Sequence, residues 1–266
     1  MVVSGKSISS VVLALLVGIG GIAAAEISGQ AETIPVATAI PVIFTQTLDA
    51  AKAKPGEAVT VKTTQVVLLP GGETIPSGTP LIGHVIEATP FVFNPAPYAV
   101  QKPSVVSVHF DKIATSGSTI PVSFSVRAIA GPVASHEASI LHYRDETDST
   151  GTRILIGGSE FSPVESQVLS PRGDVVGYNR KNGVFARLIA EDYESKNSVL
   201  DCAATDSEQS VGIFSASACG VYGMDAASMS DSGVNGDGAF VLESNSETVK
   251  LYAKSEALLQ VVGKGL

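Results

Sequence analysis

Tryptophan is absent from the sequence, and so are clusters of basic residues. Without indole rings the chain provides poorly for the stacking of sugars, which argues against carbohydrate-active enzymes. The formal net charge is −9, and no run of five or more Lys or Arg residues occurs. Nucleic acid and anionic lipid are therefore unfavourable partners.

Motifs for nucleophilic catalysis are also missing. The chain has no G-x-S-x-G turn and no S-x-x-K, and neither cysteine lies near a histidine in sequence. Residues 148–151 resemble the D-T-G of aspartic proteases, but an extra residue separates the Asp from the Gly, and a turn is the simpler interpretation. Glu160, Glu165 and Asp174 are candidates for a carboxylate pair in glycoside hydrolysis, which depends on their separation in space. We expect a protein that is not an enzyme.

The first 25 residues have the features of a secretory signal peptide. Lys6 precedes an apolar run over residues 11–25, which ends in three alanines. This run of about 15 residues is short for a bilayer, which needs roughly 20. We predict cleavage between Ala25 and Glu26. The remaining chain then has no stable transmembrane segment and resides in the periplasm or outside a bacterial-type cell.

Only two cysteines are present, Cys202 and Cys219. In an oxidising compartment the expected state is a disulfide, which closes a loop of about 17 residues and adds roughly 3 kcal/mol of stability. A metal site is the alternative. All four histidines lie at least 60 residues upstream of Cys202, without the spacing of zinc ligands, so the sequence favours the disulfide.

Alternating apolar and polar residues predict an all-β fold. The pattern is clearest in residues 106–110 and 118–130, which a turn over 115–118 joins into a hairpin, and further strands are expected at 40–44, 58–69 and 81–88. We predict an antiparallel β-barrel or barrel-like sandwich with a loop-rich, partly β insertion. Its parts are residues 26–130 as the first part of the barrel, 131–238 as an insertion with the disulfide loop and a short helix near 135–145, and 239–266 as closing barrel strands.

Metal and calcium sites receive only weak support. His84 and His109 fall in predicted strands and can face one another across a sheet, although such a pair is more commonly packed or solvated. His136 and His142 are six residues apart, which fits no helical pair. Residues 231–238 resemble part of a calcium loop but lack two of its ligands, so an Asx-rich turn is the alternative. We assign no metal and no cofactor.

Three segments of the first part carry a resemblance to a known family: residues 39–44 (AIPVIF), 53–56 (AKPG) and 74–83 (TIPSGTPLIG). They resemble the C-terminal β-barrel of the TrbI-like family of conjugation and type IV secretion outer-core proteins. In that family a strand runs into an I-P-x-G-T-x-L-x-G turn, and a hairpin follows, here residues 105–130. Within this turn Pro76 fixes φ and Gly78 permits the tight bend.

The family also has an inner-membrane helix and a long apolar helical hairpin that crosses the outer membrane. In this chain the predicted cleavable signal peptide takes the place of the inner-membrane helix. Residues 131–158 are too short and too polar to form the helical hairpin. The resemblance therefore implies the barrel rather than a channel.

Two functions remain open from the sequence. The first is a non-catalytic envelope protein with a scaffold or assembly role, whose partners are envelope proteins or the cell wall. The second is a glycan- or small-molecule-binding module that uses the insertion as a lid. Aromatic and cationic residues of the kind found at contact hot spots occur in this insertion, namely Phe161, Tyr178, Arg180, Phe185 and Arg187. Ordinary strand and turn positions are their simpler interpretation, and the oligomeric state is open.

Overall fold

The computed structural model describes residues 33–69, 72–115, 118–143, 150–162, 164–190, 198–199, 202–231 and 239–262. In these ranges almost all regular structure is β, with a single helix, α1 (Pro132–Ser139). No helix in them has the length and apolarity needed to span a membrane. The all-β prediction is confirmed. The predicted cleavage site, Ala25 and Glu26, and residues 232–238 of the calcium-like segment lie outside the described ranges.

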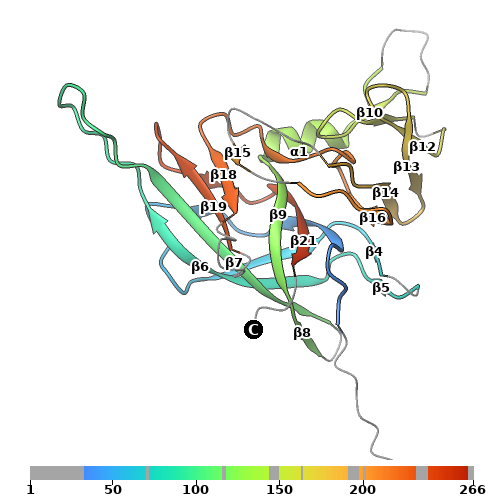
Figure 1. The fold of residues 1–266 in the computed structure, drawn as a ribbon, viewed down its shortest axis with the longest axis horizontal. Helices are drawn as coiled ribbons and strands as arrows, with labels where there is room; N and C mark the ends of the chain where they lie inside the picture. Colours follow the sequence, from blue (N-terminus) through green and yellow to red (C-terminus); the bar gives the residue numbers. More distant parts are fainter. Residues whose placement is uncertain are drawn as a thin grey trace, which may run out of the picture. The chain divides into compact units, whose positions relative to one another are not determined.

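An 11-stranded sheet forms the main body (Figure 1). In spatial order its strands are β15 (Ser198–Val199), β18 (Ser228–Asp231), β19 (Ala239–Ser244), β7 (Ser104–Ala114), β6 (Pro80–Thr89), β3 (Ala58–Thr63), β1 (Ala39–Phe44), β21 (Glu256–Val262), β9 (Ser123–Ala130) and β17 (Gly220–Tyr222). β8 (Thr119–Pro121) pairs with β7 outside this order. The last part of the chain thus contributes β19 and β21 to the same sheet as the first.

The sheet curls into a nearly closed barrel because β8 runs almost directly into β9. β8 pairs with β7 on one side, whereas β9 pairs with β21 on the other. The Val122 N–H between them donates to the Asp111 carbonyl, 2.9 Å away, and keeps the junction in place. Inside the barrel the Phe110 ring contacts the rings of Phe44 and Phe240, with centroids 6.2 and 6.1 Å away. The barrel is therefore a packed core rather than a pore.

A second sheet, of six strands, belongs to the insertion. Its strands in order are β10 (Arg153–Ile154), β11 (Glu160–Phe161), β12 (Gln167–Leu169), β13 (Val175–Arg180), β14 (Gly183–Arg187) and β16 (Glu208–Ser210). Two short ribbons complete the fold, β2 (Leu48–Asp49) with β20 (Lys250–Leu251) and β4 (Val67–Leu68) with β5 (Thr74–Ile75). The helix begins earlier than expected because Pro132 occupies its first turn, where proline is well tolerated.

One wall of the barrel is buried on both faces. On β1, β21 and β9 the outward residues Ala39, Leu258 and Ala128 have no exposed surface and belong to a second apolar core. That core continues into the insertion through Leu155, Phe161, Val184 and Phe214, among others. Small outward side chains let the insertion pack closely against the wall. The outer face of this wall and the insertion therefore share the second apolar core.

A bulge at Arg127 gives this wall its shape. The register of β9 against β21 passes from Val126 directly to Ala128, so it skips Arg127. Before the bulge, Phe124 and Val126 point into the barrel core. After the bulge, Ile129 points into it. A residue that breaks strict alternation can turn its side chain out of the barrel.

The Arg127 guanidinium, which is almost fully buried, binds the segment that carries the disulfide. It donates hydrogen bonds to the carbonyls of Ile189, Ala203, Ala216 and Ala218, at 2.5, 2.5, 3.4 and 3.0 Å. The predicted disulfide between Cys202 and Cys219 is confirmed and lies among these carbonyls. Arg127 thus links strand β9 to both arms of the disulfide loop.

Replacing Arg127 by lysine tests this link. Lysine keeps the charge but concentrates its donors on one nitrogen, so it leaves some of the buried carbonyls without a partner. We expect Arg127→Lys to lower the free energy of unfolding by about 2–3 kcal/mol, measured by urea denaturation without reductant. Arg172→Lys, at an exposed turn position, is the matched control. Equal stability of the two variants would contradict the proposed link.

A carboxyl group lies on the same wall. Glu256 faces outward at the start of β21, and its Oε2 is buried and has no hydrogen-bond partner among the residues that the structure describes. Burial raises the pKa of Glu256 to about 7, and the nearby cation Arg153 opposes part of this rise. Burial lowers the pKa of Arg153 in turn. Glu256 and Arg153 therefore lie in a buried region where desolvation disfavours the charged form of each group.

The raised pKa of Glu256 predicts a pH-dependent stability. Because the folded state holds this proton more tightly than the unfolded chain, the contribution of Glu256 is full below pH 4.5 and declines up to about pH 7. We expect the stability of the wild type relative to Glu256→Gln to fall by at most about 3 kcal/mol between pH 4 and pH 8. Urea titrations across this range measure the difference, with the exposed Glu165→Gln as control. A pH-independent difference for Glu256→Gln would refute the prediction.

Candidate functional site

The two most exposed large apolar residues of the described ranges, Tyr98 and Val100, lie on the connection between β6 and β7, residues 90–103, which we call the arm. Val92, Phe93, Tyr98 and Val100 are 49, 68, 106 and 92% exposed. In Figure 1 the arm extends beyond the ends of β6 and β7, at the left of the picture. Such a concentration of exposed aromatic and aliphatic side chains is typical of a contact surface.

Four prolines shape the arm: Pro90, Pro95, Pro97 and Pro103. Each lacks an N–H, so the strands cannot continue their ladder through this segment. A single bridge joins Val92 to Lys102. Next to it the Gln101 amide accepts from the Asn94 N–H at 2.8 Å and donates to the Asn94 carbonyl at 3.1 Å. The arm therefore has a defined backbone without being a regular hairpin.

The tip of the arm is strained. Tyr98 has a φ of 59°, in the left-handed region that a residue with a Cβ rarely adopts. This conformation costs about 1–2 kcal/mol, and the Tyr98 side chain is fully exposed, so no packing against the protein repays it. Strain of this kind concentrates at positions that bind something.

Buried hydrogen bonds fix the base of the arm to the barrel. Ser104, which has no exposed surface, donates its Oγ to the Thr89 carbonyl at 2.8 Å and accepts from the Val249 N–H at 3.0 Å. The Phe91 N–H donates to Thr248 Oγ1 at 3.2 Å. These hydrogen bonds therefore hold the base of the arm on the barrel, and the apolar tip extends from this base.

A groove of about 670 Å³ lies on the six-stranded sheet. It is lined by Val175, Val176, Gly177, Tyr178, Arg187, Ile189, Asp206 and Glu208. Of the five insertion residues singled out from the sequence, Tyr178 and Arg187 line this groove. Phe161 and Phe185 are buried and serve the core instead. The groove combines an aromatic ring, a cation and two carboxylates.

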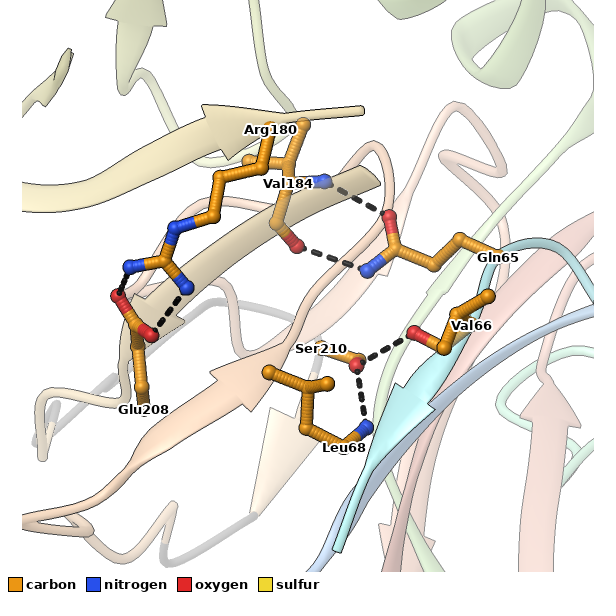
Figure 2. Close-up of polar contacts among 7 residues, drawn as sticks. All are labelled: Gln65, Val66, Leu68, Arg180, Val184, Glu208 and Ser210. Atoms are coloured by element: carbon orange, nitrogen blue, oxygen red, sulfur yellow. Dashed lines mark hydrogen bonds and ion pairs between the residues drawn. The ribbon is translucent and has the colours of Figure 1, made fainter. Parts of the chain in front are cut away.

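Arg180 stiffens one side of the groove (Figure 2). Its guanidinium forms two hydrogen bonds with the Glu208 carboxylate, at 2.6 and 2.7 Å. The same guanidinium lies 5.5 Å from the centroid of the Tyr178 ring. The two hydrogen bonds from Arg180 restrict the Glu208 side chain, and the Arg180 guanidinium covers one face of the Tyr178 ring. Both groove residues therefore have restricted positions.

The same sheet is fixed to the barrel by side chains that pair with backbone (Figure 2). The Gln65 amide donates to the Val184 carbonyl at 2.8 Å and accepts from its N–H at 2.9 Å. Ser210 Oγ donates to the Val66 carbonyl at 2.8 Å and accepts from the Leu68 N–H at 3.3 Å. The groove is therefore built on a supported sheet.

The residues that the sequence suggested for metal binding or glycoside hydrolysis lie apart from one another, except for one pair of histidines. His136 lies on α1 and His142 in a bridge to Thr152. Glu165 and Asp174 are exposed turn residues, and Glu160 lies on β11. His84 and His109, however, face one another across β6 and β7. Within the described ranges no group of three or more His, Cys, Asp or Glu residues is arranged to hold a metal ion.

Comparisons of the chain with protein-family models, with curated proteins and with solved structures found no match.

Sequence reasoning did not find the arm. Its signal was the interleaving of prolines with aromatic and aliphatic residues between two predicted strands, in residues 90–103. A connection of this length with that composition is unusual for a simple hairpin.

Proposed function

We propose that this protein is an exported, non-catalytic component of a bacterial-type cell envelope, with a scaffold or assembly role. The observation that carries the proposal is the arm, which offers aromatic and aliphatic side chains on a supported base. The disulfide supports an oxidising location such as the periplasm or the exterior. The signal-like first 25 residues support export.

The partner that fits the arm is a protein with an apolar groove. The arm carries one cation, Lys102, and the whole chain has a net charge of −9, so attraction to an anionic membrane is not favoured. Aromatic anchors inserted into a pocket are the usual source of affinity between proteins. The TrbI-like resemblance supports the same kind of role, a barrel that assembles with other envelope proteins.

Removing the apolar tip tests this role. We expect the double variant Phe93→Ser/Val100→Ser to retain at least tenfold less envelope protein than the wild type after cross-linking in envelope extract, because two contact residues of about 1–2 kcal/mol each are lost. Val133→Ser/Val164→Ser, at two exposed positions off the arm, is the matched control. All chains should unfold within about 0.5 kcal/mol of one another. The same set of cross-linked proteins in all three would exclude the arm as the contact surface.

A second function, binding of a glycan or small molecule, is favoured by the groove beside Tyr178. Peptidoglycan fragments are the first ligands to test by thermal shift. A ligand at about 100 times its dissociation constant adds about 2.7 kcal/mol of stability. Tyr178→Ala should abolish that shift and Tyr98→Ala should preserve it. A shift that survives Tyr178→Ala would place the ligand elsewhere.

A further inference from the structure

Four side chains form a row across the outer face of the barrel. Register pairs place Ala58 of β3 beside His84 of β6, His84 beside His109 of β7, and His109 beside Ala239 of β19. The residues between them in sequence, such as Val85 and Val108, point into the core. The histidines therefore face outward, and their outer neighbours in the register are alanines.

A β-bulge brings a carboxylate to this row. Gly83 pairs with Phe110 and Ile82 pairs with Lys112, so Asp111 is left out of the ladder. Gly83 permits the close approach of the strands here, since a Cβ would collide with the backbone of His109. The bulge places Asp111 Oδ2 3.0 Å from His84 Nδ1. Lys112 Nζ lies 3.9 Å from the other oxygen of the same carboxylate.

The contact with Asp111 fixes the role of each nitrogen of His84. A carboxylate can only accept a hydrogen bond, so Nδ1 carries the hydrogen. In a neutral imidazole the free lone pair is then on Nε2. Histidines that bind metals commonly have their second nitrogen held in this way. The His84 side chain is 40% exposed, so an ion from solvent can reach it.

His109 supplies the second imidazole ring. Its Nδ1 is buried and has no hydrogen-bond partner among the described residues, an uncommon and costly state for a ring nitrogen. The centroids of the two rings are 5.5 Å apart, with an angle of 62° between the planes. Two imidazoles bound tetrahedrally to one ion at about 2.1 Å have centroids about 5 Å apart. The observed separation is close to this value, and the two rings meet edge to face.

We propose that His84 and His109 form a binding site for a divalent late first-row transition ion, Zn²⁺ or Cu²⁺, with Asp111 as a positioning residue. Neutral imidazole suits both ions, whereas Ca²⁺ and Mg²⁺ prefer oxygen ligands. Water completes the coordination, because the protein supplies two ligands. A bound ion joins β6 to β7 on the outer face, below the arm that connects these two strands.

Calorimetric titration of the untagged, signal-free protein with ZnCl₂ and CuCl₂ tests the site. We expect one equivalent to bind. His84→Asn keeps a donor near Asp111 and removes Nε2, so it should weaken binding at least tenfold, as should His109→Ala. Asp111→Asn should weaken it about tenfold, the effect of losing a partner that orients a ligand. His136→Ala/His142→Ala should bind as the wild type does.

A second readout separates this site from the acidic segment 231–238. The electron paramagnetic resonance spectrum of the Cu²⁺-loaded protein should show hyperfine coupling to two nitrogens, lost in His84→Asn and kept in Asp231→Asn/Asp237→Asn. No binding by the wild type would overturn the proposal. Binding that survives both single histidine substitutions, or that is lost in the acidic-segment variant alone, would overturn it as well. Each outcome requires circular dichroism to show the same β signal as the wild type, and His109→Gln replaces His109→Ala if the latter does not fold.

Discussion

Arg127 leaves the regular alternation of β9 and turns its guanidinium toward carbonyls on both sides of the disulfide loop. A cation so deeply buried is stable only when several acceptors surround it, because desolvation is expensive. The acceptors belong to a segment that has few regular hydrogen bonds of its own. Arg127 therefore gives that segment a fixed geometry and brings the insertion against the barrel wall.

The double burial of this wall explains the other charged residues near it. Glu256 and Arg153 lie where the two layers meet, and each has a buried atom without a partner. Such a pair adds little stability, because the desolvation of both groups offsets their attraction. Its consequence is a stability of the interface that depends on pH between about 4.5 and 7, because burial raises the pKa of Glu256 from 4.5 to about 7. The barrel core, which is apolar, has no comparable dependence.

Much of the barrel was predictable because alternation is a strong signal where one face is buried. Ile120, Val122 and Phe124 were expected to share a face and do so in the core. The pairing of Cys202 with Cys219 followed from composition, since no other partner exists in the chain. The bulge at Arg127 was not predicted, because Ala128, Ile129 and Ala130 are all apolar and alternation no longer indicates which of them point inward.

The insertion was harder to predict because its strands are two to six residues long and its core is shared with the barrel wall. Phe161 looked like a contact residue in sequence, yet it fills that shared core. Phe185 is buried on the other face of β14, with the Arg180 guanidinium 5.6 Å from its ring centroid. The arm was missed for the opposite reason. Its apolar residues point to solvent, whereas hydrophobic patterns are ordinarily interpreted as burial. His84 and His109 were placed correctly as possible neighbours because both lie in strongly alternating strands.

The energetics of the arm limit what kind of contact it can make. Burying each of its large side chains yields about 1.5–3 kcal/mol, and a rigid arm loses little conformational entropy on binding. Association itself costs about 4–15 kcal/mol of translational and rotational freedom. Three or four such residues on one arm therefore do not suffice for a long-lived complex. Repetition of the contact, by several copies acting on one assembly, multiplies the effective affinity without any new interaction. The proposed assembly role is therefore consistent with repeated weak contacts through the arm rather than with tight binding of a single partner.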